Sequence, residues 1–351
     1  MKALQYRRFG DGPEVVDVAV PAVGPGQLLL RVIAAGCCHS DLHIMAAPEH
    51  EYRYGSLPLT LGHEAAGVIA ALGEGVSGFS VGDAVVVYGP WGCGVCRNCL
   101  QGKENYCTHP DGIRPPGIVV AGAMAEYLLI DHERHLMPLG DLHPVQAVAL
   151  TDAGLTSYHA IKQSIPKLGA GSHALVIGAG GLGHVAIQIL RAMSPTTVIA
   201  VDLSDDKLRF AGEIGAHHAV RGDVRAATAI RSLTNRLGVD AIFDFVGSQQ
   251  TVELAGSVVA TEGDITIVGV GKGRLLVGYR SLPFDACVRA TFWGSRPDLA
   301  EVVELARAGH IRIEVETYSL NQAPLAYQRL EAGAVRGRAV IVLDTDSGNR
   351  P

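Results

Sequence analysis

The sequence predicts an α/β protein in which a doubly wound parallel sheet is inserted into a smaller domain of short strands. Two changes of rhythm along the 351 residues predict this arrangement. Up to about residue 150, short apolar runs alternate with Gly- and Pro-rich turns, which is typical of a small β-barrel or a mostly antiparallel α+β domain. From about residue 151, strand-like and helix-like segments alternate, as in a parallel sheet with helices on both faces. Near residue 290 this alternation ends.

Short strands account for the first region. Each expected strand is an apolar run of strand length that ends near Gly or Pro. The runs are Gln27–Ala34, Gly67–Leu72, Ala84–Tyr88 and Glu126–Ile130. The Pro- and Gly-rich segment 108–122 shows no pattern that we can interpret.

The alternating region predicts one parallel sheet, because a strand–helix–strand unit makes its two strands parallel. The expected strands are His173–Gly178, Val198–Asp202, Ala241–Phe245 and Asp264–Val268. The expected helices are Gly181–Met193, Ser204–Gly212, Arg225–Arg236 and Gln249–Val259.

The last part of the chain predicts helices at Pro297–Ala308 and Gln322–Ala332 and a closing strand at Ala339–Leu343. We expect this part to return to the first domain, which makes the sheet domain an insertion. The predicted domains are therefore residues 1–151 together with 292–351, and residues 152–291.

Composition is typical of a compact globular protein and argues against two kinds of partner. Lys and Arg number 29 against 35 Asp and Glu, without a basic stripe or polybasic patch, so neither nucleic acid nor a membrane is an expected partner. No apolar run has the length of a membrane span, and residues 1–10 lack a signal-peptide core. The expected location is the cytoplasm.

Four cysteines with the spacing C-x2-C-x2-C-x7-C form the strongest single motif: Cys93, Cys96, Cys99 and Cys107. Thiolates this close along a polar loop can surround one tetrahedral zinc ion, whose binding would supply folding energy that the loop lacks. Free thiols, another metal or an iron–sulfur cluster are the alternatives, although the run lacks the C-x3-C-P ending of bacterial ferredoxins. An odd total of seven cysteines disfavours a disulfide framework. We therefore expect a structural zinc.

A glycine motif between a strand and a helix predicts a dinucleotide site. The motif residues are Gly178, Gly180, Gly181, Leu182 and Gly183. Glycines here permit a tight turn and let backbone N–H groups approach a pyrophosphate. Asp202, about 20 residues further on, is placed to accept hydrogen bonds from ribose hydroxyls and to repel a 2′-phosphate. Together the two features favour NAD over NADP.

Further metal-binding residue types occur in three other segments, Gly36–His43, Gly62–Glu64 and Thr151–Gly154. Each segment alone is ambiguous, since a single Cys often behaves as a small buried apolar residue. In combination with the zinc loop and the nucleotide motif, however, they closely resemble the zinc-dependent medium-chain alcohol dehydrogenases. The resemblance runs nearly end to end and includes C-H-S-D, L-G-H-E-A-A-G, V-G-D-A-V, T-D-A-G-L-T, V-I-G-A-G-G-L-G-H and V-D-L-S-D-D-K.

Within that family, the four-cysteine loop and the F-W-G-S segment look most like bacterial NAD-dependent secondary-alcohol dehydrogenases. The resemblance implies a Rossmann sheet domain inserted in a GroES-like β-barrel catalytic domain, with NAD and two zinc ions per subunit. It implies reversible oxidation of secondary alcohols to ketones, by hydride transfer from a zinc-bound alkoxide. A homodimer or homotetramer is expected by the same resemblance.

The resemblance makes Cys38, His63 and Asp152 the ligands of a catalytic zinc, with the fourth position open. Glu64 would lie behind these ligands or occasionally replace one of them. Asp41 would orient the imidazole of His63, although it is equally placed to cap a helix.

Ser40 resembles the family hydroxyl that bonds the substrate oxygen, and His43 would relay its proton to solvent. A pocket wall and an inert surface position are the alternatives for His43, because close relatives often carry an aromatic residue there. The remaining implied positions are pocket walls at Tyr54, Phe292 and Trp293, nicotinamide contacts at Val246, Val268 and Val270, and Lys207 near the adenosine ribose.

Two alternatives remain open for the function. One is a primary-alcohol or polyol dehydrogenase on the same scaffold, which Asp152 argues against because polyol enzymes usually place a glutamate around this ligand. The other is a non-catalytic nucleotide-binding protein, which loss of Cys38, His63 or Asp152 would mark; all three are present.

Overall fold

Residues 1–343 are described by the computed structural model, and the chain divides into two compact units. The first unit contains Met1–Asp152, Ser295–Arg307 and the chain from Ile313 on, and the second contains Ala153–Gly294 and Ala308–Arg312. Part of the predicted returning segment, residues 344–351, lies outside the described residues.

This division differs from the sequence prediction at three points: Asp152 joins the first unit, while residues 292–294 and 308–312 join the second. Asp152 lies against Cys38 and Arg338, both of which belong to the first unit. Gly294 packs on Leu155 of the second unit so closely that a Cβ would lie 2.8 Å from its Cγ. Such contacts assign these residues, and the sequence rhythm does not show them.

The first unit is a mostly antiparallel β domain. Its seven-stranded sheet has the order β15-β16-β3-β5-β6-β8, with β7 paired to β3, and every pairing except β15–β16 is antiparallel. A three-stranded sheet has the order β2-β1-β4. The strands are β1 (Lys2–Tyr6), β2 (Glu14–Asp17), β3 (Leu28–Gly36), β4 (Leu59–Thr60), β5 (Glu64–Leu72), β6 (Ala84–Val87), β7 (Tyr127–Ile130), β8 (Leu136–Pro138), β15 (Val315–Ser319) and β16 (Arg338–Val342).

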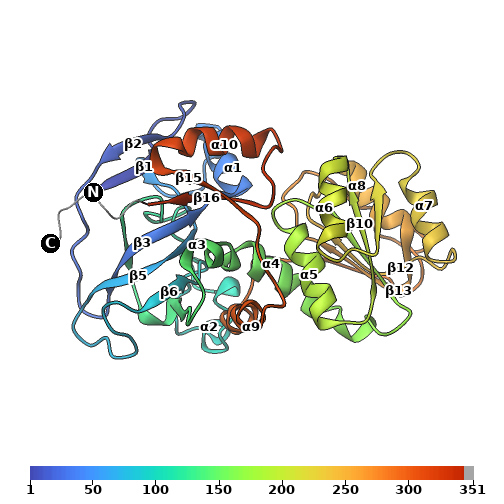
Figure 1. Ribbon diagram of the computed structural model, residues 1–351, viewed down its shortest axis with the longest axis horizontal. Coiled ribbons are helices and arrows are strands. Elements are labelled where there is room, and N and C mark those ends of the chain that lie inside the picture. Colours follow the sequence, from blue (N-terminus) through green and yellow to red (C-terminus); the bar gives the residue numbers. More distant parts are fainter. Residues whose placement is uncertain (344–351) are drawn as a thin grey trace. The chain divides into compact units, whose positions relative to one another are not determined.

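The helices of this unit are α1 (His39–Ala46), α2 (Arg97–Leu100), α3 (Pro144–Ala147), α9 (Arg296–Arg307) and α10 (Ala323–Glu331). Figure 1 shows the red β16 beside the blue β3, and their antiparallel pairing joins Val340 to Gly36. One apolar core contains Leu4 and Leu30 from the start of the chain and Tyr327 and Ile341 from its end. The end of the chain therefore completes the first domain.

The second unit is a doubly wound parallel sheet with the strand order β11-β10-β9-β12-β13-β14 (Figure 1). Its strands are β9 (His173–Ile177), β10 (Thr197–Asp202), β11 (His218–Arg221), β12 (Val239–Asp244), β13 (Val259–Ile267) and β14 (Cys287–Ala290). Its helices are α4 (Ala153–Lys162), α5 (Gly183–Met193), α6 (Asp205–Glu213), α7 (Ala226–Leu233) and α8 (Gln249–Val258). The strand order reverses between β9 and β12, and dinucleotides bind at such a point.

The predicted fold class is confirmed, and most predicted elements lie within two residues of the observed ones. The largest shift is in β13, which begins at Val259 rather than Asp264 because it follows α8 without a loop. Among residues 1–343, no helix combines the length and apolar composition that crossing a bilayer requires.

Candidate active site and metal centres

The four cysteines of the predicted zinc loop lie together in the first unit, with their sulfur atoms within 4.8 Å of one another. Cys99 Sγ is 3.4 Å from Cys96 Sγ and 3.9 Å from Cys93 Sγ, and Cys96 Sγ is 4.0 Å from Cys107 Sγ. A tetrahedral zinc with bonds of about 2.3 Å separates its sulfur ligands by about 3.8 Å. The observed spacings fit this ion.

The thiols of this cluster differ in acidity. Hydrogen bonds from the backbone of Thr108 and Cys99 lower the pKa of Cys96 to about 5. Burial raises the pKa of Cys99, and the neighbouring sulfurs raise it further. A divalent cation would favour the thiolate form of all four cysteines.

A buried ionic network lies behind the loop, and sequence reasoning did not find it. Glu104, fully buried between two of the cysteines in sequence, accepts from the Gly92 N–H at 2.8 Å and lies 3.0 Å from His135 Nε2. Arg134 and Arg296 approach the same carboxylate at 3.3 and 3.5 Å. Because Gly92 directly precedes Cys93, the network fixes the start of the loop.

A second cluster of metal-binding groups forms around Cys38, His63, Glu64 and Asp152, whose ligand atoms lie within 4.8 Å of one another. Cys38 follows β3, His63 directly precedes β5, and Asp152 ends the first unit. Cys38 Sγ is 3.5 Å from Asp152 Oδ2, and zinc bonds of about 2.3 Å to sulfur and 2.1 Å to oxygen predict about 3.6 Å. One thiolate, one imidazole and one carboxylate fit a divalent cation with an open position.

Asp41 connects three parts of this cluster. It is the third residue of α1, and its Oδ2 accepts from the Cys38 backbone N–H at 3.0 Å, so the capping role is present. Its Oδ1 lies 3.2 Å from His63 Nδ1. With the proton on Nδ1, this contact orients the ring and leaves the Nε2 lone pair free for a metal. Tyr327, 286 residues further along the chain, donates its hydroxyl to Asp41 Oδ2 at 3.0 Å.

The buried imidazole of His63 has a raised pKa. Burial alone lowers the pKa of His63, but the negative Asp41 and Cys38 groups more than offset this and hold it well above its ordinary value. The surroundings of His63 are thus strongly negative, which favours a cation at this position.

Glu64 lies behind the ligands and is fully buried. Its Oε1 forms an ion pair with Arg338 of β16, which lies 3.6 Å from Asp152 Oδ2 as well. Glu64 Oε2 has no hydrogen-bond partner within residues 1–343. Gly36 leaves the space for this carboxylate, since a Cβ there would lie 2.5 Å from Glu64 Cδ.

Ser40 and His43 lie one turn apart on α1 and therefore on one face of it. Ser40 Oγ is half-buried and 3.6 Å from Cys38 Sγ, whereas His43 is exposed. A path from the cluster to solvent along this helix face is therefore short.

The glycine motif of the second unit forms a tight turn before α5. Gly178 has a positive φ of 89°, and a Cβ on Gly183 would meet its carbonyl group at 2.9 Å or less. A Cβ on Gly180 would meet nothing within 4 Å, so the turn leaves open space beside the helix N-terminus. Free N–H groups at that end can bind phosphate.

Asp202 ends β10, beside this turn. Its Oδ2 accepts from the Ala179 N–H at 2.9 Å and its Oδ1 from the Ser204 N–H at 3.0 Å. Ser204 in turn caps α6, which carries Lys207 in its first turn. The carboxylate thus organises the turn and retains lone pairs for ribose hydroxyls.

The three valines predicted to contact nicotinamide follow the carboxyl ends of β12 and β13. Val246 and Val270 are exposed and Val268 is half-buried. Asp244, which the sequence analysis did not single out, joins their two loops: its Oδ1 accepts from Val246 at 2.9 Å, and its carbonyl accepts from Val268 at 2.8 Å. The valines therefore share one edge of the sheet.

The three predicted pocket residues belong to different units. Tyr54, in the first unit, is 37% exposed and packs edge-on against Tyr52. Phe292 and Trp293, in the second unit, form an edge-to-face pair with ring centroids 6.2 Å apart. Trp293 is buried and Phe292 exposed.

The residues that sequence reasoning missed carry no local sequence motif. Tyr327 and Arg338 contact Asp41 and Glu64 across 286 and 274 residues of chain. Glu104 and His135 carry no motif of their own. One signal was available. A charged residue within an apolar stretch of sequence is expected to be buried, and a buried charge needs a partner.

Family models match both parts of the chain. One, described as an alcohol dehydrogenase GroES-like domain, matches residues 24–141, and another, described as a zinc-binding dehydrogenase, matches residues 181–308. An NAD-dependent alcohol dehydrogenase of Sulfolobus acidocaldarius is 36% identical over 97% of this chain and 99% of its own. A D-arabinose 1-dehydrogenase (NADP(+)) of Saccharolobus solfataricus is 35% identical over 97% of both.

Solved structures give the same picture. The alcohol dehydrogenase of Aeropyrum pernix has a TM-score of 0.90 and 34% identity, covering 97% of this chain and all of its own. The acetophenone reductase of Geotrichum candidum, solved with NAD, has a TM-score of 0.85 and 30% identity, covering 99% and 98%.

Proposed function

We propose that this chain, which belongs to the zinc-dependent medium-chain alcohol dehydrogenase family, oxidises secondary alcohols to ketones with NAD and catalyses the reverse reduction. The convergence of Cys38, His63 and Asp152 carries the proposal, because this donor set suits a zinc ion with an open coordination position. The likeness to an acetophenone reductase supports a ketone substrate. The likeness to a D-arabinose dehydrogenase fits the polyol alternative only weakly.

When bound, zinc supplies Lewis acidity toward a substrate oxygen and NAD supplies the hydride acceptor. Cys38, His63 and Asp152 would hold the zinc, and their two negative charges offset those of the ion. Asp41 holds the tautomer of His63 that exposes Nε2. A second zinc in the four-cysteine loop would fold that loop without entering the chemistry.

The proton of the alcohol leaves through α1 in this proposal. Ser40 Oγ accepts the proton from the substrate hydroxyl as it releases its own hydroxyl proton toward His43, which is exposed one turn further on and passes that proton to solvent. The first unit therefore acts as the catalytic domain.

The second unit acts as the NAD-binding domain. The N–H groups at the start of α5 would hold the pyrophosphate, and Asp202 would hold the adenosine ribose with Lys207 nearby. Val246, Val268 and Val270 would contact the nicotinamide. Asp202 favours NAD, because its charge repels the 2′-phosphate of NADP.

The test is NADH formation by zinc-loaded protein with 1-phenylethanol, ethanol, sorbitol and D-arabinose. We expect a rapid reaction with 1-phenylethanol alone. Preference for ethanol, sorbitol or D-arabinose would replace the proposal by the primary-alcohol or polyol alternative, and no reaction with any substrate would refute both. As a control, Asp152→Asn should abolish activity and leave one zinc per chain, since the four-cysteine loop is untouched.

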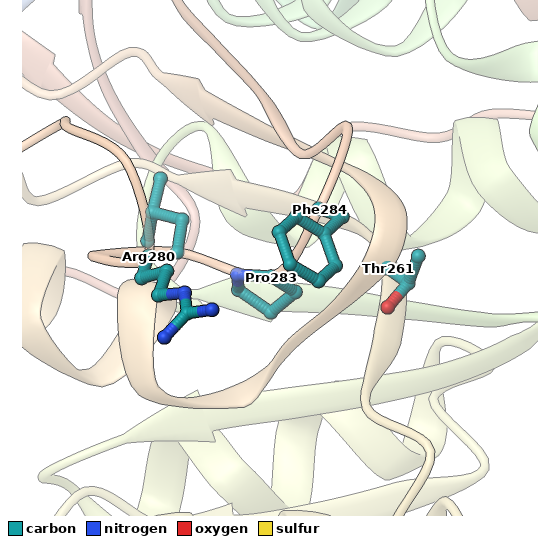
Figure 2. A pocket seen from close by; sticks show the side chains of 5 residues that line it. Thr261, Arg280, Pro283 and Phe284 are labelled. Carbon is teal, nitrogen blue, oxygen red and sulfur yellow. The ribbon is translucent and has the colours of Figure 1, made fainter.

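We further propose that the protein forms homodimers through β14. This strand has β13 as its only strand partner within residues 1–343, so its outer edge presents unpaired N–H and C=O groups. The preceding segment exposes four apolar side chains, those of Leu276, Val277, Tyr279 and Phe284. Pro283 and Phe284 line a hollow of about 410 Å³. Figure 2 shows these two side chains. Antiparallel pairing of identical strands about a two-fold axis would cover both features.

Light scattering after size exclusion tests the dimer. Phe284→Glu should shift the parent toward the 36.8 kDa monomer, whereas Val224→Glu, on a fully exposed side chain of the same unit, should not. A monomeric parent would overturn the proposal.

All seven cysteines are unpaired in the structure, which supports a cytoplasmic location for this assembly.

A further inference from the structure

No sequence pattern explained the segment 108–122. Its last residue and the two that follow it, Ala123 and Met124, pack against the three residues that precede His63. The Gly122 N–H donates to the Thr60 carbonyl at 2.9 Å, and the Ala123 N–H donates to the Gly62 carbonyl at 2.8 Å. The Met124 N–H donates to the Leu61 carbonyl at 2.9 Å. Three consecutive backbone bonds therefore hold the approach to His63.

Two glycines in this segment contact Gly62 without room for a side chain. A Cβ on Gly117 would lie 2.7 Å from Gly62 N and nearer still to the Gly62 carbonyl group. A Cβ on Gly122 would lie 2.5 Å from both Gly62 O and Gly117 Cα. Gly62 itself has a φ of 94°, so its conformation is one that side chains rarely adopt.

The same segment reaches the other side of His63 through side chains. Met124 Sδ is 3.1 Å from the Tyr327 hydroxyl, which donates to Asp41 Oδ2. The other oxygen of Asp41 faces His63 Nδ1. Both the backbone before His63 and the partner of its ring are therefore in contact with residues 117–124.

The far side of the segment is anchored as well. Its Ile118 carbonyl accepts from the Gly55 N–H at 2.8 Å. The Arg114 N–H donates to Trp91 at 2.8 Å, next to the four-cysteine loop. Moving the segment away from Gly62 would therefore also break its contacts with Gly55 and Trp91.

We propose that Pro115–Met124 is a positioning element that sets the place of the His63 imidazole, so that its Nε2 reaches the metal held with Cys38 and Asp152. The inference rests on the proposed metal site but not on alcohol oxidation. A zinc–nitrogen bond has a length of about 2.0–2.1 Å, so a small shift of Gly62 weakens this bond before it disturbs the fold. Groups that orient a metal ligand change metal affinity by about 10- to 100-fold.

The test compares Gly117→Ala with Gly112→Ala. Both glycines have similar positive φ values, 72° and 65°, but a Cβ on Gly112 would meet nothing within 4 Å. The two variants therefore share the backbone strain and differ only in the contact with Gly62. The readouts are release of the metal held by Cys38, His63 and Asp152 to a chelator and the absorption spectrum after cobalt replaces that metal.

We expect Gly117→Ala to release this metal about 10- to 100-fold faster and to change the cobalt spectrum, and Gly112→Ala to do neither. A Gly117→Ala protein that melts earlier but keeps the parent's release rate and spectrum would reduce the segment to a structural part and overturn the inference. A parent that binds metal only at the four cysteines would overturn the proposed function as well.

Hydrogen exchange of the unaltered protein covers the case in which Gly117→Ala does not fold. Removal of the metal at Cys38, His63 and Asp152 should speed exchange at the amides of residues 122–124 together with those near His63. The reason is that backbone hydrogen bonds join residues 122–124 to residues 60–62, so loosening one side loosens the other. Exchange at residues 122–124 that ignores the metal would overturn the inference.

Discussion

Replacing Arg338 with Met removes a cation that faces both Glu64 and Asp152. Arg338 is 3% exposed and Glu64 is fully buried, so the pair has little access to water. Methionine fills a similar length without a charge. The substitution therefore leaves the Glu64 carboxylate buried and uncompensated.

The size of the effect follows from the geometry. At the 3.6 Å that separates Arg338 from Asp152 Oδ2, unit charges attract by about 4–5 kcal/mol at an effective dielectric constant of about 20. While the pair is intact, this attraction offsets much of the cost of removing both charges from water. A lone buried carboxylate still bears its desolvation cost but has no partner to offset it. We expect Arg338→Met to lower the free energy of unfolding by about 3–5 kcal/mol.

The assay uses the two tryptophans of the sequence, of which Trp91 belongs to the first unit and Trp293 to the second. In a Trp293→Phe background, fluorescence during urea unfolding reports on the unit that contains Arg338. Trp91 is buried and stacks on His135 with ring centroids 5.1 Å apart, so its emission changes when this unit opens.

A double-mutant cycle with Glu64→Gln separates the ion pair from lost packing. The double variant should be more stable than the sum of the single losses predicts, with a coupling energy of about 2–3 kcal/mol. A loss below about 1 kcal/mol for Arg338→Met, or additive effects within about 0.5 kcal/mol, would refute the reasoning.

Four further predictions concern other groups. Asp264 is buried, yet Lys167, Ser164 and Arg289 offset burial and hold its pKa below the ordinary value, so its stabilisation is present at neutral pH and lost as pH falls through the folded pKa. Asp264→Asn should therefore lower the free energy of unfolding, measured by urea titration, by about 1.5–3 kcal/mol at pH 7 but not near pH 3. Glu104→Gln should speed zinc release from the four-cysteine loop, measured with a chelating dye, because His135, Arg134 and Arg296 lose their shared anion; release at the parent rate would contradict this. Asp202→Asn keeps an acceptor for only one of the Ala179 and Ser204 amides and loses the charge, so the ratio of kcat/KM for NAD over NADP should fall, and an unchanged ratio removes Asp202 from this role. His43→Ala should shift the pH profile of kcat while leaving KM for NAD unchanged, and an unmoved profile excludes the relay.

Local patterns predicted much of the fold and the four-cysteine cluster. The four cysteines lie within 15 residues, so chain geometry alone brings their sulfurs together. The helix–strand alternation after residue 151 predicted a parallel sheet because side-chain periodicity reflects local backbone conformation. The strands β1, β2, β4, β8, β11, β14 and β15 were not predicted, since they are short or carry few buried side chains.

The sequence by itself determined what lies within a few residues: the cysteine loop, the glycine turn with Asp202, and the start of α1 that carries Cys38 and Asp41. The ligand types at Cys38, His63 and Asp152 came from resemblance rather than from spacing. Only the tertiary structure decided which distant polar groups meet, as Arg338 and Glu64 do in an ion pair and Tyr327 and Asp41 do in a hydrogen bond. It also decided that Gly117 rests on Gly62. The physical reason is that hydrogen bonds and ion pairs depend on distance in space, and nothing in a local pattern records which distant strand or helix will satisfy a buried polar group.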